Sequence, residues 1–101
     1  MKIINTAIEG VYIIEPQVFE DNRGYFFESY NKQKMDEAGL KYDFIQDNQS
    51  MSKYGTIRGI HFQKGDFAQA KLVRVLEGTV LDVAVDLRKG SKTFGKHVAV
   101  R

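Results

Sequence analysis

Short apolar segments with a two-residue period dominate the chain, and they restrict it to a mainly β fold. Val, Ile, Tyr and Phe alternate with polar residues, and Gly, Asn or Asp separate the segments. Many short strands joined by glycine-bearing turns favour a sandwich or barrel over a parallel α/β sheet. Strands are predicted over residues 11–14, 25–30, 43–46, 55–63, 71–76, 79–87 and 96–100.

One segment departs from this period and predicts a single short helix. Asn31 is suited to cap a helix over residues 32–38, and Gly39 is suited to end it. Residues 21–24, Asp-Asn-Arg-Gly, predict a turn, because Asn and Asp bond their own backbone and Gly accepts a positive φ.

The length of 101 residues predicts one domain over residues 1–101 with one core, for which 43% hydrophobic and 12% aromatic residues are sufficient. The last predicted strand lies directly before Arg101. A β-barrel that stops in mid-sheet leaves an unpaired edge, so we expect a truncated barrel that further residues or a partner complete.

Charge and composition exclude several classes of function. The net charge is only +2 and the basic residues are dispersed, which is not the pattern of a nucleic-acid-binding arm. The absence of cysteine excludes disulfides and zinc-thiolate sites. Neither a secretion signal nor an apolar run of roughly 20 residues is present, so we expect a cytoplasmic protein that does not bind membranes.

Three polar side chains in the predicted strands are candidates for chemistry. Alternation along residues 58–63 directs His61 away from the large apolar residues, although a lone histidine is ordinarily a partly buried structural residue. Lys71 and Asp82 lie in runs rich in valine, and burial of either charge unpaired costs several kcal/mol. We therefore expect them to pair with each other or with a ligand. A purely structural ion pair is the alternative.

The spacing of Gly55, His61 and Gln63 resembles the first cupin motif, which in metal-binding members carries a second histidine and then a glutamate. Gln63 replaces that histidine, Asp66 is the only nearby acid, and His97 does not fit the spacing. One imidazole is too few for a transition-metal site, so we expect no metal. This disfavours a metal-dependent cupin oxygenase.

Four segments resemble successive signature blocks of the dTDP-4-dehydrorhamnose 3,5-epimerases, in the same order and at similar separations. The blocks are residues 19–28, 46–50, 58–63 and 85–88, the last followed by Ser91 and Phe94-Gly95. The resemblance implies a cupin-type jelly-roll β-barrel, a dTDP-sugar substrate, a homodimer and no cofactor.

The resemblance also implies roles for individual residues. His61 matches the base that removes a proton, Lys71 matches the lysine near the C4 carbonyl oxygen of the sugar, and Asp82 matches an acidic position lining the pocket. The positions that hold the nucleotide diphosphate-sugar are Arg23, Glu28, Gln46, Asn48 and Arg58, of which the first two are expected to reach across the dimer interface. The family draws its acid, a tyrosine, and the aspartate that orients the histidine from the second half of the barrel.

The expected function is therefore an isomerase that inverts C3 and C5 of dTDP-4-dehydro-6-deoxyglucose in dTDP-L-rhamnose and cell-surface polysaccharide biosynthesis. We expect the 101-residue chain alone to lack the acid and to be inactive. A related sugar-nucleotide 3- or 5-epimerase or keto-isomerase is the alternative among enzymes. A non-catalytic sugar-nucleotide-binding cupin is the alternative of another class, although a pure binder has no need for a base opposite the carbonyl.

Overall fold

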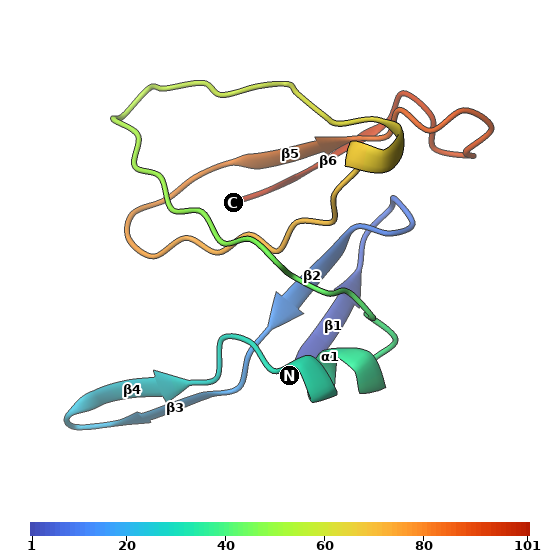
Figure 1. Cartoon of the computed structure of the whole chain (residues 1–101). Helices are drawn as coiled ribbons and strands as arrows, with labels where there is room; N and C mark the ends of the chain where they lie inside the picture. The colour runs from blue at the N-terminus through green and yellow to red at the C-terminus, as the bar shows by residue number, and fades with distance from the viewer. The chain divides into compact units, whose positions relative to one another are not determined.

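The computed structural model describes residues 1–101 and is mainly β with one short α-helix (Figure 1). The strands form three separate antiparallel pairs, and none of these two-stranded sheets closes a barrel. By backbone contacts the chain divides into two compact units, residues 1–40 with 75–101 and residues 41–74. The elements are β1 (Lys2–Asn5), β2 (Tyr12–Glu15), β3 (Val18–Asp21), β4 (Gly24–Phe27), α1 (Lys32–Glu37), the 3₁₀ turn η1 (Gly65–Phe67), β5 (Asp82–Val85) and β6 (His97–Val100).

The β1–β2 pair places isoleucines opposite one another across the strands, Ile3 with Ile14 and Ile4 with Ile13. Such β-branched pairs stabilise an antiparallel ladder. In the connection between the strands, the Ile8 amide donates to Thr6 Oγ1 at 3.2 Å, and the Ile8 side chain is buried.

The β3–β4 pair is a hairpin closed by a two-residue turn, because Asp21 pairs with Gly24 in the register. The turn predicted over residues 21–24 is confirmed, while the strand expected over residues 25–30 ends at Phe27. Most of the large side chains of this hairpin face solvent: Tyr25 is 71% exposed, Phe26 is 70% exposed and Phe19 is 56% exposed. In Figure 1 the hairpin extends away from β1, β2 and α1.

The helix is present where the sequence predicts it and ends one residue earlier, at Glu37. Asn31 caps it, since its side chain accepts a hydrogen bond from the Lys34 amide. Gly39 has a φ of +84°, and the Leu40 amide donates to the Met35 carbonyl at 2.9 Å, which satisfies a terminal carbonyl. Met35 and Leu40 are both buried and anchor the helix.

The β5–β6 pair confirms strands within residues 79–87 and 96–100, both shorter than predicted. In the register Asp82 lies opposite Val100, and Ala84 lies opposite Val98. Because alternate residues share a face, Asp82 lies on the same face of the sheet as Ala84, Val98 and Val100.

The strands predicted over residues 43–46, 55–63 and 71–76 are absent, and this part of the prediction is wrong for the chain as it stands. Residues 41–74 contain η1 and otherwise no regular element, and every residue in them is exposed. A strand exists only where a neighbouring backbone completes its hydrogen bonds. The alternation of apolar and polar residues predicts which side chains share a face of a strand. It does not predict whether a neighbouring strand is present.

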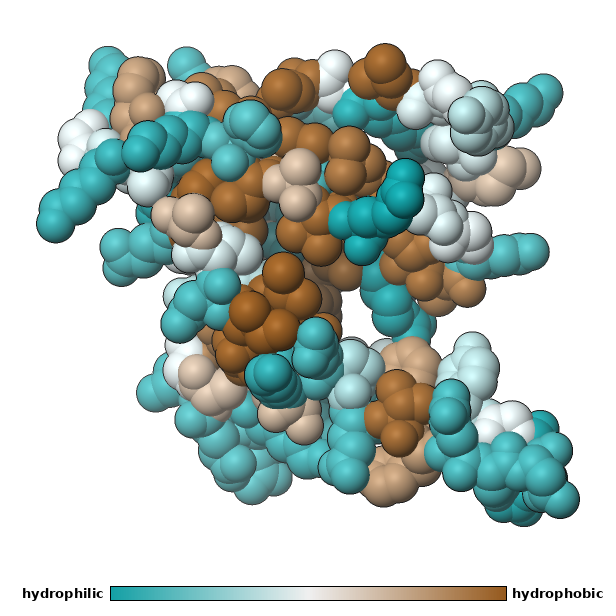
Figure 2. All heavy atoms as spheres, turned by 180° about the vertical axis from the view of Figure 1, so that it is seen from behind, coloured by the Kyte–Doolittle hydropathy of each residue, from teal (hydrophilic) through white to brown (hydrophobic).

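The apolar residues are largely uncovered. The buried hydrophobic side chains are Ile8, Met35 and Leu40, whereas many large apolar side chains on the hairpins and in residues 41–74 are exposed. Figure 2 shows apolar residues reaching the surface over much of one face. Exposed apolar surface of this extent is uncommon on monomeric soluble proteins.

Candidate functional site

The structure places the predicted base and its partner lysine in the exposed segment of residues 41–74. His61 and Lys71 both lie in extended stretches outside any sheet, and neither side chain forms a hydrogen bond or an ion pair within that segment. Gly59 precedes His61 with a φ of +120°, a conformation that favours glycine. Asp82, the third predicted catalytic residue, begins β5 and is exposed. Their convergence on one pocket stays a prediction.

Gln46 and Asn48, two of the predicted substrate-binding residues, lie close together. Gln46 Nε2 lies 3.4 Å from Asn48 Oδ1, at the long end of the range for a hydrogen bond. Farther along the same segment, Arg58 Nη2 lies 3.5 Å from the Met51 carbonyl oxygen, so its guanidinium is held only weakly. These side chains are exposed and have further donors and acceptors for a ligand.

Arg23 is held by an aspartate two residues before it. Asp21 Oδ2 accepts hydrogen bonds from Arg23 Nε at 3.1 Å and Nη2 at 2.6 Å, and Asp21 Oδ1 accepts one from the Arg23 amide at 2.8 Å. This hydrogen-bonding to Arg23 lowers the pKa of Asp21 and raises that of Arg23. The Arg23 side chain is still 85% exposed, so its remaining N–H groups are accessible to an anion.

Glu28 follows β4 directly and contacts the first turn of α1. Glu28 Oε1 lies 3.0 Å from Lys34 Nζ, and Oε2 accepts a hydrogen bond from Asn31 Nδ2 at 3.2 Å. Lys34 first and Asn31 second lower the pKa of Glu28. The carboxylate is therefore ionised at neutral pH and acts only as an acceptor.

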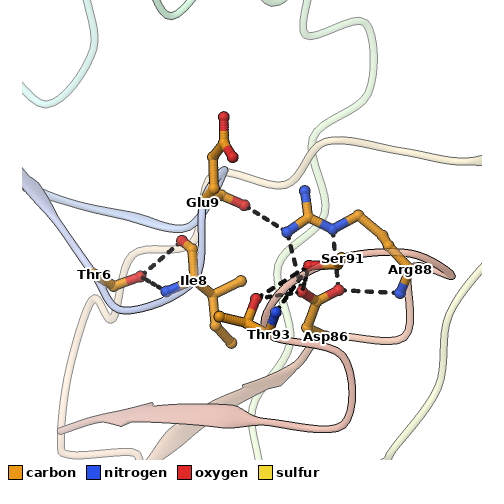
Figure 3. Close-up of polar contacts among 7 residues, drawn as sticks. All are labelled: Thr6, Ile8, Glu9, Asp86, Arg88, Ser91 and Thr93. Carbon is orange, nitrogen blue, oxygen red and sulfur yellow. Dashed lines mark hydrogen bonds and ion pairs between the residues drawn. The ribbon is translucent and has the colours of Figure 1, made fainter.

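A buried aspartate that sequence reasoning did not single out lies at the end of β5. The side chain of Asp86 is 1% exposed, and its carboxylate accepts hydrogen bonds from the Arg88 guanidinium and amide. Ser91 Oγ and Thr93 Oγ1 donate to Asp86 Oδ2, each at 2.6 Å (Figure 3). Arg88 first, then Ser91 and Thr93, hold the pKa of Asp86 far below its usual range. The sequence signal for this aspartate is an arginine two residues later. Asp21, which is exposed, has the same spacing, so the spacing alone does not predict burial.

This aspartate cluster, Asp86 with Arg88, Ser91 and Thr93, connects two loops of the same unit. Arg88 Nη2 donates to the Glu9 carbonyl oxygen at 2.9 Å and so reaches the loop between β1 and β2 (Figure 3). The Asp86 amide also donates to the carbonyl of Lys96, the residue directly before β6, at 2.9 Å. Because every polar group of the buried carboxylate is satisfied from within the chain, we assign the cluster a structural role.

The structure shows neither a metal site nor a helix that could span a membrane. No three His, Asp or Glu side chains come close enough together to hold a metal ion. No helix has the length and apolar composition needed to cross a bilayer.

Comparisons with known proteins agree on one family. A sequence model of the dTDP-4-dehydrorhamnose 3,5-epimerases matches residues 5–101. The dTDP-4-dehydrorhamnose 3,5-epimerase of Salmonella typhimurium is 57% identical over 101 residues, which cover 99% of this chain and 55% of that protein. The chain thus spans about half the length of the curated relatives that it matches.

Two crystal structures have the same backbone arrangement over nearly the whole chain. The dTDP-4-dehydrorhamnose 3,5-epimerase of Elizabethkingia anophelis matches with a TM-score of 0.91 and 58% identity, covering 99% of this chain and 55% of that chain. The dTDP-6-deoxy-D-glucose-3,5-epimerase of Legionella pneumophila, solved in complex with dTDP-4-keto-L-rhamnose, matches with a TM-score of 0.90 and 49% identity, covering 98% and 53%.

Proposed function

Because the chain belongs to the dTDP-4-dehydrorhamnose 3,5-epimerase family, we propose that the complete protein converts dTDP-4-dehydro-6-deoxyglucose into dTDP-4-dehydro-L-rhamnose. The conversion inverts C3 and C5 and serves dTDP-L-rhamnose and cell-surface polysaccharide biosynthesis. The observation that carries this proposal is identity of 57% across 99% of the chain to a protein of that activity. The ligand named in the Legionella structure supports a dTDP-sugar as the substrate class.

The chemistry requires a base, a cation and an acid around one ketone. A base removes the proton on a carbon next to the C4 carbonyl, a positive group stabilises the enolate oxygen, and an acid returns a proton to the opposite face. His61 supplies the base, Lys71 supplies the ammonium group beside the C4 oxygen, and Asp82 lines the same pocket. The acid and the aspartate that orients the base are expected from the second half of the barrel, as the resemblance to the family implies.

Substrate binding uses the charged and amide groups described above. Arg23 and Arg58 carry permanent charge and several N–H donors, which suit the oxygens of a diphosphate. Gln46 and Asn48 each offer a donor and an acceptor, which suit the edge of thymine. The exposure of both arginines and the closeness of the two amides support this assignment.

We propose a cupin-type jelly-roll barrel for the complete protein, with residues 1–101 as part of a single domain. In that barrel, residues 55–63 and 71–76 would pair with neighbouring strands, and their apolar side chains would be covered. We also propose a cytoplasmic homodimer in which the β3–β4 hairpin lies against the partner's pocket. The exposure of Phe19, Tyr25 and Phe26 supports such an interface, because aromatic residues are enriched at interface cores.

The dimer is tested on the full-length protein by mass measurement in solution. We expect a mass of twice the subunit at working enzyme concentration. A fully active protein that sediments as a monomer would exclude any role of the hairpin in a partner's pocket.

Substitution of Arg58 tests the binding assignment. Arg58→Ala removes a diphosphate contact that substrate and transition state share, so KM should rise about tenfold or more while kcat changes little. Steady-state kinetics of the full-length enzyme measure this, with Arg74→Ala as a control that removes an exposed arginine from the same segment. Equal KM increases for the two variants would indicate a general loss of positive charge and not a specific contact.

Identification of the product separates the proposal from its alternatives. The complete protein with dTDP-4-dehydro-6-deoxyglucose should yield dTDP-4-dehydro-L-rhamnose, which NMR coupling constants around the sugar ring identify. A product inverted at one carbon only would select a 3- or 5-epimerase. Tight binding with unchanged substrate would select a non-catalytic sugar-nucleotide-binding cupin.

A further inference from the structure

Both oxygens of the Glu28 carboxylate are engaged by side chains at the start of α1. Lys34 Nζ lies 3.0 Å from Oε1, and Asn31 Nδ2 donates to Oε2 at 3.2 Å. The Glu28 side chain is nevertheless 45% exposed, so the carboxylate still has free acceptor positions toward solvent. A long, exposed side chain is thereby limited to few conformations before any ligand arrives.

The amide of Asn31 makes two contacts that determine its orientation. Its Oδ1 accepts a hydrogen bond from the Lys34 amide at 3.0 Å, which is the cap of the helix. A backbone N–H only donates, so the amide oxygen must face it, and the Nδ2 group consequently faces Glu28. Capping of the helix and contact with Glu28 are therefore linked through one side chain.

The helix that carries these contacts is anchored by buried side chains, whereas the strand directly before Glu28 is largely exposed. Met35 and Leu40 are buried at 4% and 6% exposure, and both follow closely after Lys34 in the chain. β4 directly precedes Glu28, and three of its four residues are exposed, while Phe27 at its end is half-buried. The helix start is thus the better-fixed element of the two, and it can determine where the Glu28 carboxylate lies.

We propose that Asn31 and Lys34 are positioning residues that hold Glu28 ready to accept an N–H or O–H group of the nucleotide-sugar. This rests on the proposed function, which places Glu28 among the ligand-binding residues. A lone carboxylate near the binding site would repel a diphosphate, and the ammonium group of Lys34 offsets that charge. Lys34 therefore allows an acidic acceptor to bind an anionic ligand.

The test measures dTDP affinity by calorimetry, and kcat and KM with the dTDP-sugar, on the full-length protein. Glu28→Gln should weaken dTDP binding, and Lys34→Gln and Asn31→Ser should each weaken it about three- to tenfold, through KM and not kcat. Serine preserves the helix cap but cannot reach Glu28, so Asn31→Ser should leave the Tm nearly unchanged. Lys34→Arg should restore affinity to near the unsubstituted value.

The matched control is Lys32→Gln on the same helix. Lys32 pairs with Asp36 at 3.0 Å with a similarly exposed side chain, 54% against 57% for Lys34. Lys32→Gln therefore removes a lysine charge and an ion pair from the same helix while Asn31 and Lys34 stay in place, and this variant should bind dTDP normally. In a Glu28→Gln background, Lys34→Gln should cause no further loss, because a positioning residue acts through the group that it positions.

Three results would overturn the inference. If Glu28→Gln weakens dTDP binding while Lys34→Gln and Asn31→Ser bind dTDP normally, then Glu28 does not need these residues to hold it in position. If Lys34→Gln weakens dTDP binding as much in the Glu28→Gln background as it does alone, then Lys34 acts independently of Glu28. Normal affinity in Glu28→Gln would remove Glu28 from the ligand site, while turnover by the same variant would leave the epimerase function intact.

Discussion

Asp86→Asn should destabilise the protein far more than Asp21→Asn, although both aspartates bind an arginine two residues later through the same groups. The Asp86 carboxylate is 1% exposed and receives donors from Arg88, Ser91 and Thr93, whereas the Asp21 side chain is 48% exposed and is bonded by Arg23 alone. An asparagine at position 86 turns an NH₂ group toward these donors and leaves them unsatisfied. We expect a Tm lower by about 10 °C for Asp86→Asn and by about 2 °C or less for Asp21→Asn.

Thermal unfolding of both full-length variants measures this difference, with dTDP affinity as the second readout. Asp21→Asn preserves the turn and is the matched control for loss of one carboxylate charge. Similar Tm values for the two variants would mean that the aspartate cluster does not hold the β1–β2 and β5–β6 loops together.

The same pair of variants predicts a difference at low pH. The folded-state pKa of Asp86 is depressed below its ordinary value of 3.8, so the unfolded chain takes up the proton first. Its contribution to the free energy of unfolding is then complete above about pH 4 and falls as the pH is lowered. The Tm of the unsubstituted protein should decline below about pH 4 more steeply than that of Asp86→Asn, and parallel curves would contradict the assignment.

Local sequence signals predicted the helix, one turn and the strands β2, β4, β5 and β6, but not β1 or β3. Asn31 and Gly39 bracket the helix that the structure contains, and residues 21–24 form the predicted turn, because capping and turn formation depend on side chains that are only a few residues apart. β5 and β6 were predicted as strands from another local signal, because both segments are short and rich in valine.

Non-local features could not be predicted in the same way. The stretches around His61 and Lys71 alternate as strands do, yet within this chain no backbone pairs with them. Alternation likewise drew attention to Asp82, which is exposed, and not to Asp86, which is buried. Burial of a carboxylate depends on which donors the fold brings to it, and for Asp86 two of these lie in the loop after β5.

His61→Ala should abolish exchange of solvent deuterium into the sugar at C3 and C5 while leaving dTDP affinity nearly unchanged. In the proposed mechanism the imidazole acts on the sugar carbons, whereas affinity comes from Arg23, Arg58 and the amides assigned to thymine. Loss of a general base costs about 10²- to 10⁴-fold in rate. Single-turnover kinetics and dTDP calorimetry on full-length protein measure the two quantities, with His97→Ala as the control for loss of an exposed histidine. Near-normal exchange in His61→Ala would show that another group is the base.

The most direct measurement follows the protons of dTDP-4-dehydro-6-deoxyglucose by NMR in D₂O after addition of the full-length enzyme. We expect deuterium to replace the protons at both C3 and C5 and the product to be dTDP-4-dehydro-L-rhamnose. Retention of both protons by a protein that demonstrably binds dTDP would contradict the proposed epimerase function.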